Sequence, residues 1–226
     1  RVMLASLMVA VGIVATIGLF ADHLQRTIMT SATSFLAADR QLASSHPLPE
    51  AFRNEAENRE LATARQISFA TMLQGGSGME LVRVRAVDGD YPLRGEVEMQ
   101  DAPGGPRRML DHGPEQGGIW VNARLLRLLD VEPGDRVGVG DVRLRITGVL
   151  VRSPDAGFDL AALAPRVMMH HADVEAAGVV QPGSRVTYRD LYAGPESDLN
   201  AFHEWLKPRL SEGQRWRSVE DGQAGV

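Results

Sequence analysis

Residues 117–150 read GGIWVNARLLRLLDVEPGDRVGVGDVRLRITGVL, and their pattern predicts a strand, a helix and then two further strands. Ile119 to Val121 form a short apolar run, and Asn122 is a suitable N-cap for a helix that continues to Leu129. The Glu-Pro-Gly-Asp sequence at 132–135 is typical of a tight turn. After it, residues 142–150 alternate apolar and polar side chains, which indicates a strand with one buried face. We expect this block to form a β-rich unit.

The residues before this block predict a second group of elements. Residues 101–118 are rich in Pro and Gly, which predicts a loop between two subdomains. Upstream of that loop we expect an extended run over 39–45, a helix over 50–61, and strands over 62–73 and 81–87 joined by the GGSG sequence at 75–78. Together these elements form a β-α-β-β unit.

The residues after the block predict a further alternation of strand and helix, as the residues before it do. We expect a strand from Arg185 to Tyr192, a helix from Ser197 to Lys207 with Ser197 as its N-cap, and a final strand over 214–219. Asp190 interrupts an otherwise apolar face of the first of these strands, and the sequence offers no explanation for it. The fold class is therefore α+β: one split subdomain made by both ends of the chain, with a β-rich subdomain inserted between its halves.

The first residues of the chain predict a membrane helix. Val2 to Ala21 contain no charged residue, and at ~1.5 Å per residue this run reaches about 30 Å, the thickness of a hydrocarbon core. A cleaved signal peptide is the alternative, but the apolar run is long for one and Leu19-Phe20-Ala21 is a poor cleavage site. Arg1 at the front favours an outward orientation for everything after residue 21. Residues 22–38 are expected to continue the helix as a rigid stalk, and the chain as a piece of a longer protein.

The composition excludes several classes of protein. The 226 residues include no cysteine, which excludes disulfides, thiol catalysis and thiolate metal sites. Twenty-four basic and 29 acidic residues leave a net charge of −5, so nucleic acid is not an expected partner.

Motifs for catalysis and cofactor binding are missing from the sequence. It contains neither the G-x-x-x-x-G-K-[ST] loop that cradles nucleotide phosphates nor the G-x-S-x-G sequence of many hydrolases. His170 and His171 are adjacent, so their side chains are expected to point in different directions and not to share a metal ion. Met168 and Met169 are expected to fill a core. We therefore predict no enzymatic activity and no catalytic, cofactor-binding or metal-binding residues in this chain.

Two apolar features are candidates for contact with a partner or substrate. Phe158, Leu160 and Leu163 belong to a short apolar segment bounded by Gly and Pro, which is either buried or an exposed contact loop. Trp216 lies between two arginines, a pattern that suits contact with lipid headgroups.

The order of these features resembles a known family. Besides the block at 117–150, the resemblance rests on RVRAVDGDYPLRGEV at 83–97, SPDAGFDLAALAPRVMM at 153–169 and VVQPGSRVTYRDLYAG at 179–194. The chain resembles the MacB-type periplasmic core domain of FtsX-like ABC transporter permeases. More specifically, it is similar to the large permeases encoded beside a separate ATPase and a periplasmic esterase or lysophospholipase.

The resemblance implies a function for the chain. It implies a permease subunit in the bacterial inner membrane, with residues 22–226 in the periplasm and ATP bound by a separate ATPase subunit. Export or extraction of a lipid-like or hydrophobic substrate, and membrane lipid and the periplasmic hydrolase as partners, follow from the same resemblance. The stalk would act as a lever, because a helix has a fixed length and a flexible linker would dissipate a displacement.

The expected domains are a transmembrane helix over 1–21, the stalk over 22–38, a porter-like first half over 39–100, the inserted β-rich subdomain over 101–183 and a porter-like second half over 184–226. An alternative from a different class is a single-pass anchored module that recruits a periplasmic lipase or an acylated substrate. The two alternatives differ in whether nucleotide turnover drives the domain.

Overall fold

The computed structural model describes residues 37–155, 165–181 and 183–218. The predicted membrane helix, most of the stalk and the segment that contains Phe158, Leu160 and Leu163 lie outside these residues. Within the described ranges, no helix is both long and apolar enough to cross a bilayer. The described chain forms a mixed α+β domain built on an 11-stranded sheet.

The first third of the domain has the predicted β-α-β-β order. It comprises β1 (Arg40–Ser44), α2 (Glu50–Asn58), β2 (Ala62–Gln74) and β3 (Met79–Val87). β2 and β3 form the predicted antiparallel hairpin, in which the Gly75 N–H donates to the Gly78 carbonyl at 2.9 Å. A Cβ atom at Gly75 would lie 2.5 Å from the Cβ of Leu129, so only glycine lets this turn pack so closely on the following helix.

The middle of the chain contains two strands that the sequence pattern did not predict, at 97–100 and 107–110. Its elements are β4 (Val97–Gln100), β5 (Arg107–Leu110), β6 (Gly118–Val121), α3 (Ala123–Leu129), β7 (Arg136–Val139) and β8 (Val142–Arg152). The expectation of a loop over 101–118 was therefore wrong for β5, which pairs antiparallel with β4. The Pro and Gly residues at 103–106 turn the chain between these two strands. The predicted N-cap is confirmed, since Asn122 Oδ1 accepts from the Arg124 N–H at 2.9 Å.

The last third adds two unpredicted elements. It comprises β9 (Arg166–His170), α4 (Asp173–Ala177), β10 (Thr187–Ala193), α5 (Glu196–Leu206), the 3-10 turn η1 (Lys207–Arg209) and β11 (Arg215–Ser218). Of these, β9 and α4 are the new elements. The prediction of Ser197 as N-cap was wrong: Pro195 precedes the helix, and the Ser197 hydroxyl bonds to Asp198.

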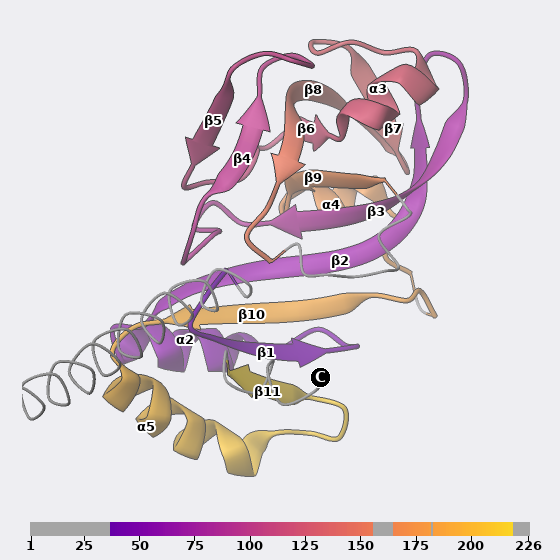
Figure 1. Ribbon diagram of the computed structural model, residues 1–226. Helices are drawn as coiled ribbons and strands as arrows, with labels where there is room; N and C mark the ends of the chain where they lie inside the picture. The colour runs from indigo at the N-terminus through magenta and orange to yellow at the C-terminus, as the bar shows by residue number, and fades with distance from the viewer. Residues whose placement is uncertain (1–36, 156–164, 182, 219–226) are drawn as a thin grey trace, which may run out of the picture.

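The strand order interleaves the two ends of the chain. It runs β11-β1-β10-β2-β3-β9-β6-β8-β4-β5, and β7 pairs with both β2 and β8. β10 lies between β1 and β2, so a strand from the end of the chain is inserted among strands from its beginning. Figure 1 shows that the long β2 passes along β10 and then curves up to join β3, β7 and α3. β2 is therefore the common strand of the two halves of the molecule.

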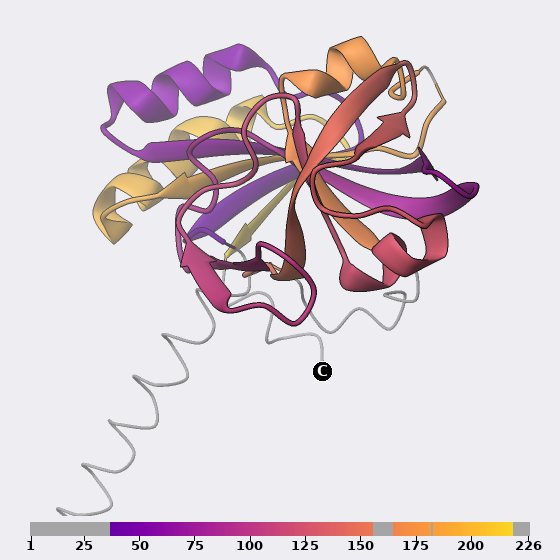
Figure 2. The same ribbon diagram turned by 90° about the horizontal axis from the view of Figure 1, so that it is seen from above.

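Two separate cores of apolar side chains pack the helices against this sheet. Figures 1 and 2 show α2 and α5 together beside the β1, β10 and β11 strands. The core between them contains Phe52 and Ala56 of α2, and Phe202 and Leu206 of α5. A separate core under α3 is built from apolar side chains of β2, β3 and β6–β9. Met168 and Met169 are fully buried, which confirms the expectation that they fill a core.

Candidate functional site

The domain has a fixed entry point at the start of the described residues. Ala37 and Ala38 are fully buried, and the Ala37 carbonyl accepts from the Arg94 N–H at 3.0 Å. The carboxylate of Asp39 is held by the Arg94 guanidinium through two bonds, Nε to Oδ1 at 3.0 Å and Nη2 to Oδ2 at 2.7 Å. The Gly194 N–H adds a third bond to Asp39 Oδ2, at 3.1 Å. A bidentate pair with such a backbone bond fixes direction as well as distance.

The other end of the described chain lies beside this entry point. β11 pairs antiparallel with β1, so that Arg40 lies opposite Ser218 and Leu42 opposite Trp216. The two chain ends of the domain therefore leave from neighbouring strands at one edge of the sheet (Figure 1).

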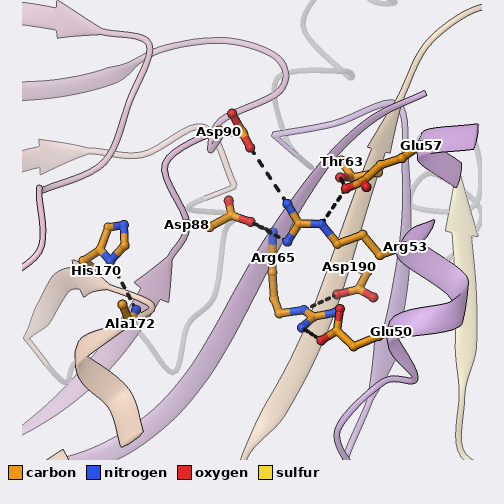
Figure 3. Close-up of polar contacts among 10 residues, drawn as sticks. All are labelled: Glu50, Arg53, Glu57, Thr63, Arg65, Asp88, Asp90, His170, Ala172 and Asp190. Carbon is orange, nitrogen blue, oxygen red and sulfur yellow. Dashed lines mark hydrogen bonds and ion pairs between the residues drawn. The ribbon is translucent and has the colours of Figure 1, made fainter. Parts of the chain in front are cut away.

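Asp190 belongs to a polar cluster between α2 and the sheet (Figure 3). Arg65 on β2 donates from Nε to Asp190 Oδ1 at 3.0 Å and from Nη1 to Glu50 on α2. Burial raises the pKa of Asp190, and the Arg65 guanidinium opposes this shift. Asp190, which the sequence pattern left unexplained, is therefore the buried partner of Arg65 beneath α2.

Arg53 makes a second set of contacts in the same cluster. It bonds to Glu57 at 2.8 Å and to Asp88 at 3.3 Å, and its Nη2 lies 3.9 Å from Asp90. Asp88 Oδ2 also accepts from the Arg65 N–H at 2.6 Å. Because Asp88 and Asp90 follow β3, these contacts tie α2 to the segment that leads into the second half of the molecule.

The structure places the two histidines near this cluster. The Nδ1 atom of His170 accepts from the Ala172 N–H at 3.2 Å (Figure 3). His171 is half-buried, and burial followed by the charge of Arg65 lowers its pKa. The described residues contain no group of three or more His, Cys, Asp or Glu side chains suited to hold a metal ion.

Trp216 lies in an aromatic cluster. Its ring is stacked on that of His203, with centroids 5.0 Å apart and planes 8° from parallel, and it also meets Tyr192 and Phe202. The ring is partly buried in the core beneath α5. Contact of Trp216 with lipid or a partner stays a prediction, as does the role of Phe158, Leu160 and Leu163.

One hollow in the described chain is lined by arginines. It has a volume of about 470 Å³, and its charged lining comprises Arg83, Arg85, Arg166, Arg185, Arg189 and Asp155. We call it the arginine groove. Sheet register explains how it forms: Arg83 of β3 lies opposite Arg166 of β9, and Arg189 of β10 lies opposite Gln66 of β2. Residues paired in this way point to one face of the sheet.

The floor of the groove is held rigidly. Arg85 Nη1 donates to Asp155 Oδ1 and to Ser153 Oγ, both at 2.5 Å. The Tyr91 hydroxyl, fully buried, also donates to Asp155 Oδ1 at 2.5 Å. Burial, followed by the Asp155 charge, raises the pKa of Tyr91 well above its ordinary value. Asp155 is therefore already engaged by its own partners.

Arg189 is a partly buried side chain of the groove with a shifted pKa. Its Nη1 donates to Ser68 at 3.2 Å and, with the Gln66 amide oriented to satisfy its neighbours, to the Gln66 oxygen at 3.1 Å. Burial lowers the pKa of Arg189; the Asp155 charge opposes this shift, and the Arg85 charge adds to it. The lowered pKa of this guanidinium therefore reflects mainly its burial.

Sequence reasoning missed this groove. The alternation of Arg83 and Arg85 with valines was visible, but alternation predicts only a half-buried strand. The other arginines come from strands that are distant in sequence and adjacent only through the sheet order.

Comparison with known proteins finds a similarity to ABC transporter permeases. No profile of a known protein family matches it. It is 38% identical over 221 residues to the uncharacterized ABC transporter permease YbbP of Escherichia coli K12, an alignment that covers 98% of this chain. The chain is therefore similar to a part of an ABC transporter permease. It spans about a quarter of the length of the curated relative, 26%.

Solved structures of transporter domains share the fold of this chain. The periplasmic region of MacB from Actinobacillus actinomycetemcomitans aligns with a TM-score of 0.57 at 10% identity, over 84% of this chain and 94% of that one. The extracellular domain of the noncanonic ABC-type transporter YknZ from Gram-positive bacteria aligns with a TM-score of 0.53 at 8% identity, over 79% of this chain and all of that one. The family resemblance found in the sequence is confirmed.

Proposed function

We propose that the chain is the periplasmic domain and first membrane helix of a permease subunit in the bacterial inner membrane. In this proposal a separate ATPase binds and hydrolyses ATP, and the domain couples that hydrolysis to export or extraction of a lipid-like or hydrophobic substrate. The 38% identity to a permease over nearly the whole chain supports the assignment to this class. A periplasmic esterase or lysophospholipase is the proposed downstream partner, and the chain itself is proposed to have no enzymatic activity.

The observation that carries the coupling role is the pairing of β1 with β11. Since the two chain ends leave from adjacent strands, a displacement of the segments on either side would move one edge of the sheet. β10 joins this edge to β2, and β2 continues into the second half of the molecule. Asp39 and Arg94 would transmit the movement at the entry point, because two parallel bonds resist rotation.

The test inserts three glycines after Ala32 in the full-length permease, reconstituted with its ATPase in vesicles. Glycines would interrupt a helical stalk and make the connection flexible. We expect assembly with the ATPase and basal ATP hydrolysis to persist and nucleotide-dependent release of lipid to be lost.

The matched control inserts the same glycines between Gly104 and Gly105, in the β4–β5 turn far from the chain ends. Nucleotide-dependent release of lipid should persist in this control variant. Undiminished transport by the stalk variant would refute the lever role. Recruitment of a hydrolase or an acylated substrate without any dependence on nucleotide would favour the anchored-module alternative instead.

A further inference from the structure

The polar cluster beneath α2 contains more carboxylates than guanidinium groups (Figure 3). Two guanidinium groups, those of Arg53 and Arg65, lie among the carboxylates of Glu50, Glu57, Asp88, Asp90 and Asp190. Other titratable groups face the cluster from β9 and β10, namely His170, His171 and Tyr192. Because neighbouring negative charges disfavour ionisation, such a surplus of carboxylates favours the uptake of a proton.

The two oxygens of Asp88 differ in their surroundings. Oδ2 accepts from the Arg65 N–H at 2.6 Å and from Arg53 Nη1 at 3.3 Å. In the described part of the chain, Oδ1 is buried and has no hydrogen-bond partner. Burial raises the pKa of Asp88; the backbone bond from Arg65 and the charge of Arg53 oppose this rise, and the charge of Asp90 adds to it. Asp88 is therefore a suitable position for the proton.

The bond to Asp88 is the main contact through which Arg53 attaches α2 to the residues after β3. Glu57, at 2.8 Å, belongs to α2 itself, so its pair with Arg53 attaches the helix to nothing else. Asp90 lies 3.9 Å away and its side chain is 71% exposed, which makes a weak pair. The Asp88 side chain is only 17% exposed.

The segment that carries Asp88 is fixed at its other end. The buried Tyr91 hydroxyl donates to Asp155 Oδ1 at 2.5 Å, at the end of β8. The contact between Arg53 and Asp88 therefore joins α2, in the first half of the molecule, to the segment that continues into the second half.

The other contacts of α2 do not depend on the charge of Asp88. Glu50 accepts from Arg65, and this hydrogen bond lowers the pKa of Glu50, so the pair persists in mild acid. Phe52 and Ala56 remain buried in the core shared with α5. Loss of the Asp88 charge would loosen one contact of the helix without releasing it.

We propose that Asp88 and Arg53 form an acid-sensitive tie, in which a proton taken up from solvent by Asp88 removes the charge that holds Arg53 and loosens α2 against residues 88–91. This is a regulatory feature of the domain itself and goes beyond the proposed transport function. It is tested without ATPase or nucleotide, so that the two can fail separately.

The expected change is local. Because the folded pKa of Asp88 is raised above its unfolded value, the folded domain binds this proton before the unfolded chain does. Uptake of the proton therefore does not lower the free energy of global unfolding, and the loss should be confined to α2.

The experiment measures hydrogen exchange of the full chain in detergent at pH 7.5 and pH 4.5, with labelling times corrected for the intrinsic exchange rates. The His171→Gln variant is the background protein, so that this imidazole does not contribute to the titration. We expect protection of the α2 amides to fall about ten-fold between the two pH values, because one charge-assisted contact is lost. The amides of α3 should keep their protection and serve as the internal reference.

Two variants remove the tie. Asp88→Asn keeps the size of the side chain and an oxygen that can accept from the Arg65 N–H, but it carries no charge. Its α2 amides should be about ten-fold less protected already at pH 7.5 and should show no further change at pH 4.5. Arg53→Gln should behave in the same way.

The matched control is Glu55→Gln, which removes another carboxylate of α2. Glu55 pairs with Arg59 of the same helix, and its side chain is 27% exposed. The pH dependence of α2 protection should persist in this variant.

Equal protection of α2 at both pH values in the background protein would overturn the proposal, as would an undiminished pH dependence in Asp88→Asn. Loss of the pH dependence in Glu55→Gln as well would show that any change of charge on α2 suffices, which also contradicts a specific role for Asp88.

Discussion

At the scale of single residues, the acid on β10 has the most direct consequence. Asp190 is 3% exposed and shares Arg65 with Glu50. Asp190→Asn should destabilise the domain by about 2 kcal/mol, because a guanidinium under α2 loses its buried partner while Glu50 compensates in part. Urea unfolding of the full chain in detergent, followed by tryptophan fluorescence, measures this.

The control for that prediction is Glu57→Gln, which removes a carboxylate whose side chain is 49% exposed in its pair with Arg53. We expect this substitution to lower the free energy of unfolding by at most about 0.5 kcal/mol. Equal losses of unfolding free energy from the two substitutions would contradict the prediction that the buried contact between Arg65 and Asp190 stabilises the domain more than the exposed pair does.

The half-buried His171 side chain predicts that the stability of the domain depends on pH. Burial and nearby arginine charge hold its folded pKa below the unfolded value of about 6.5. The unfolded state therefore takes up the proton first, and stability falls as the pH drops below about 6.5 and through the folded pKa. His171→Gln should remove this loss, so that the wild type loses more stability than the variant between pH 7.5 and pH 5.5.

The raised pKa values of Asp88 and Asp190 act in the opposite direction on acidification, but they are common to both proteins and cancel in the difference. Parallel stability curves for wild type and His171→Gln would contradict the prediction.

At the scale of elements, local signals identified most helices and strands. The Asn122 cap, the GGSG turn and the alternation after Asp141 are all encoded by a few neighbouring residues. β4, β5 and β9 were missed for a common reason: each is short and is stabilised as a strand by its pairing. β4 pairs with β5 and β8, and β9 pairs with β3 and β6. Ser197 has the chemistry of a cap, but the preceding Pro195 already starts α5.

The cap on α3 gives a prediction at this scale. Asn122→Ala should destabilise the domain by about 1 kcal/mol, because the Arg124 N–H loses its acceptor. Hydrogen exchange at the first turn of α3 should accelerate accordingly. Asn200→Ala, on the exposed face of α5, is the control and should be neutral or slightly stabilising.

At the scale of the whole molecule, the proposed coupling would depend on how the chain enters the sheet. Arg94→Lys keeps the charge but loses the fork that holds Asp39. In the reconstituted permease we expect less lipid transported per ATP hydrolysed, with nearly unchanged stability, since the Arg94 side chain is 44% exposed.

Arg108→Lys is the control for the entry point, because Arg108 pairs with Asp101 on an exposed turn at the other end of the strand order. Equal coupling ratios for Arg94→Lys and wild type would contradict a role for the Asp39 pair.

The α+β class and the order of most elements were determined by the sequence alone, because periodicity, capping and turn residues act over a few positions and survive in the chain as readable patterns. The resemblance to permeases rested on the longer stretches of sequence at 83–97, 117–150, 153–169 and 179–194. The position of β10 between β1 and β2, the partner of Asp190 and the arginine groove were decided only by the tertiary structure. Each of these depends on which distant strands lie side by side, and that choice is made by the burial of whole faces and not by any local pattern of residues.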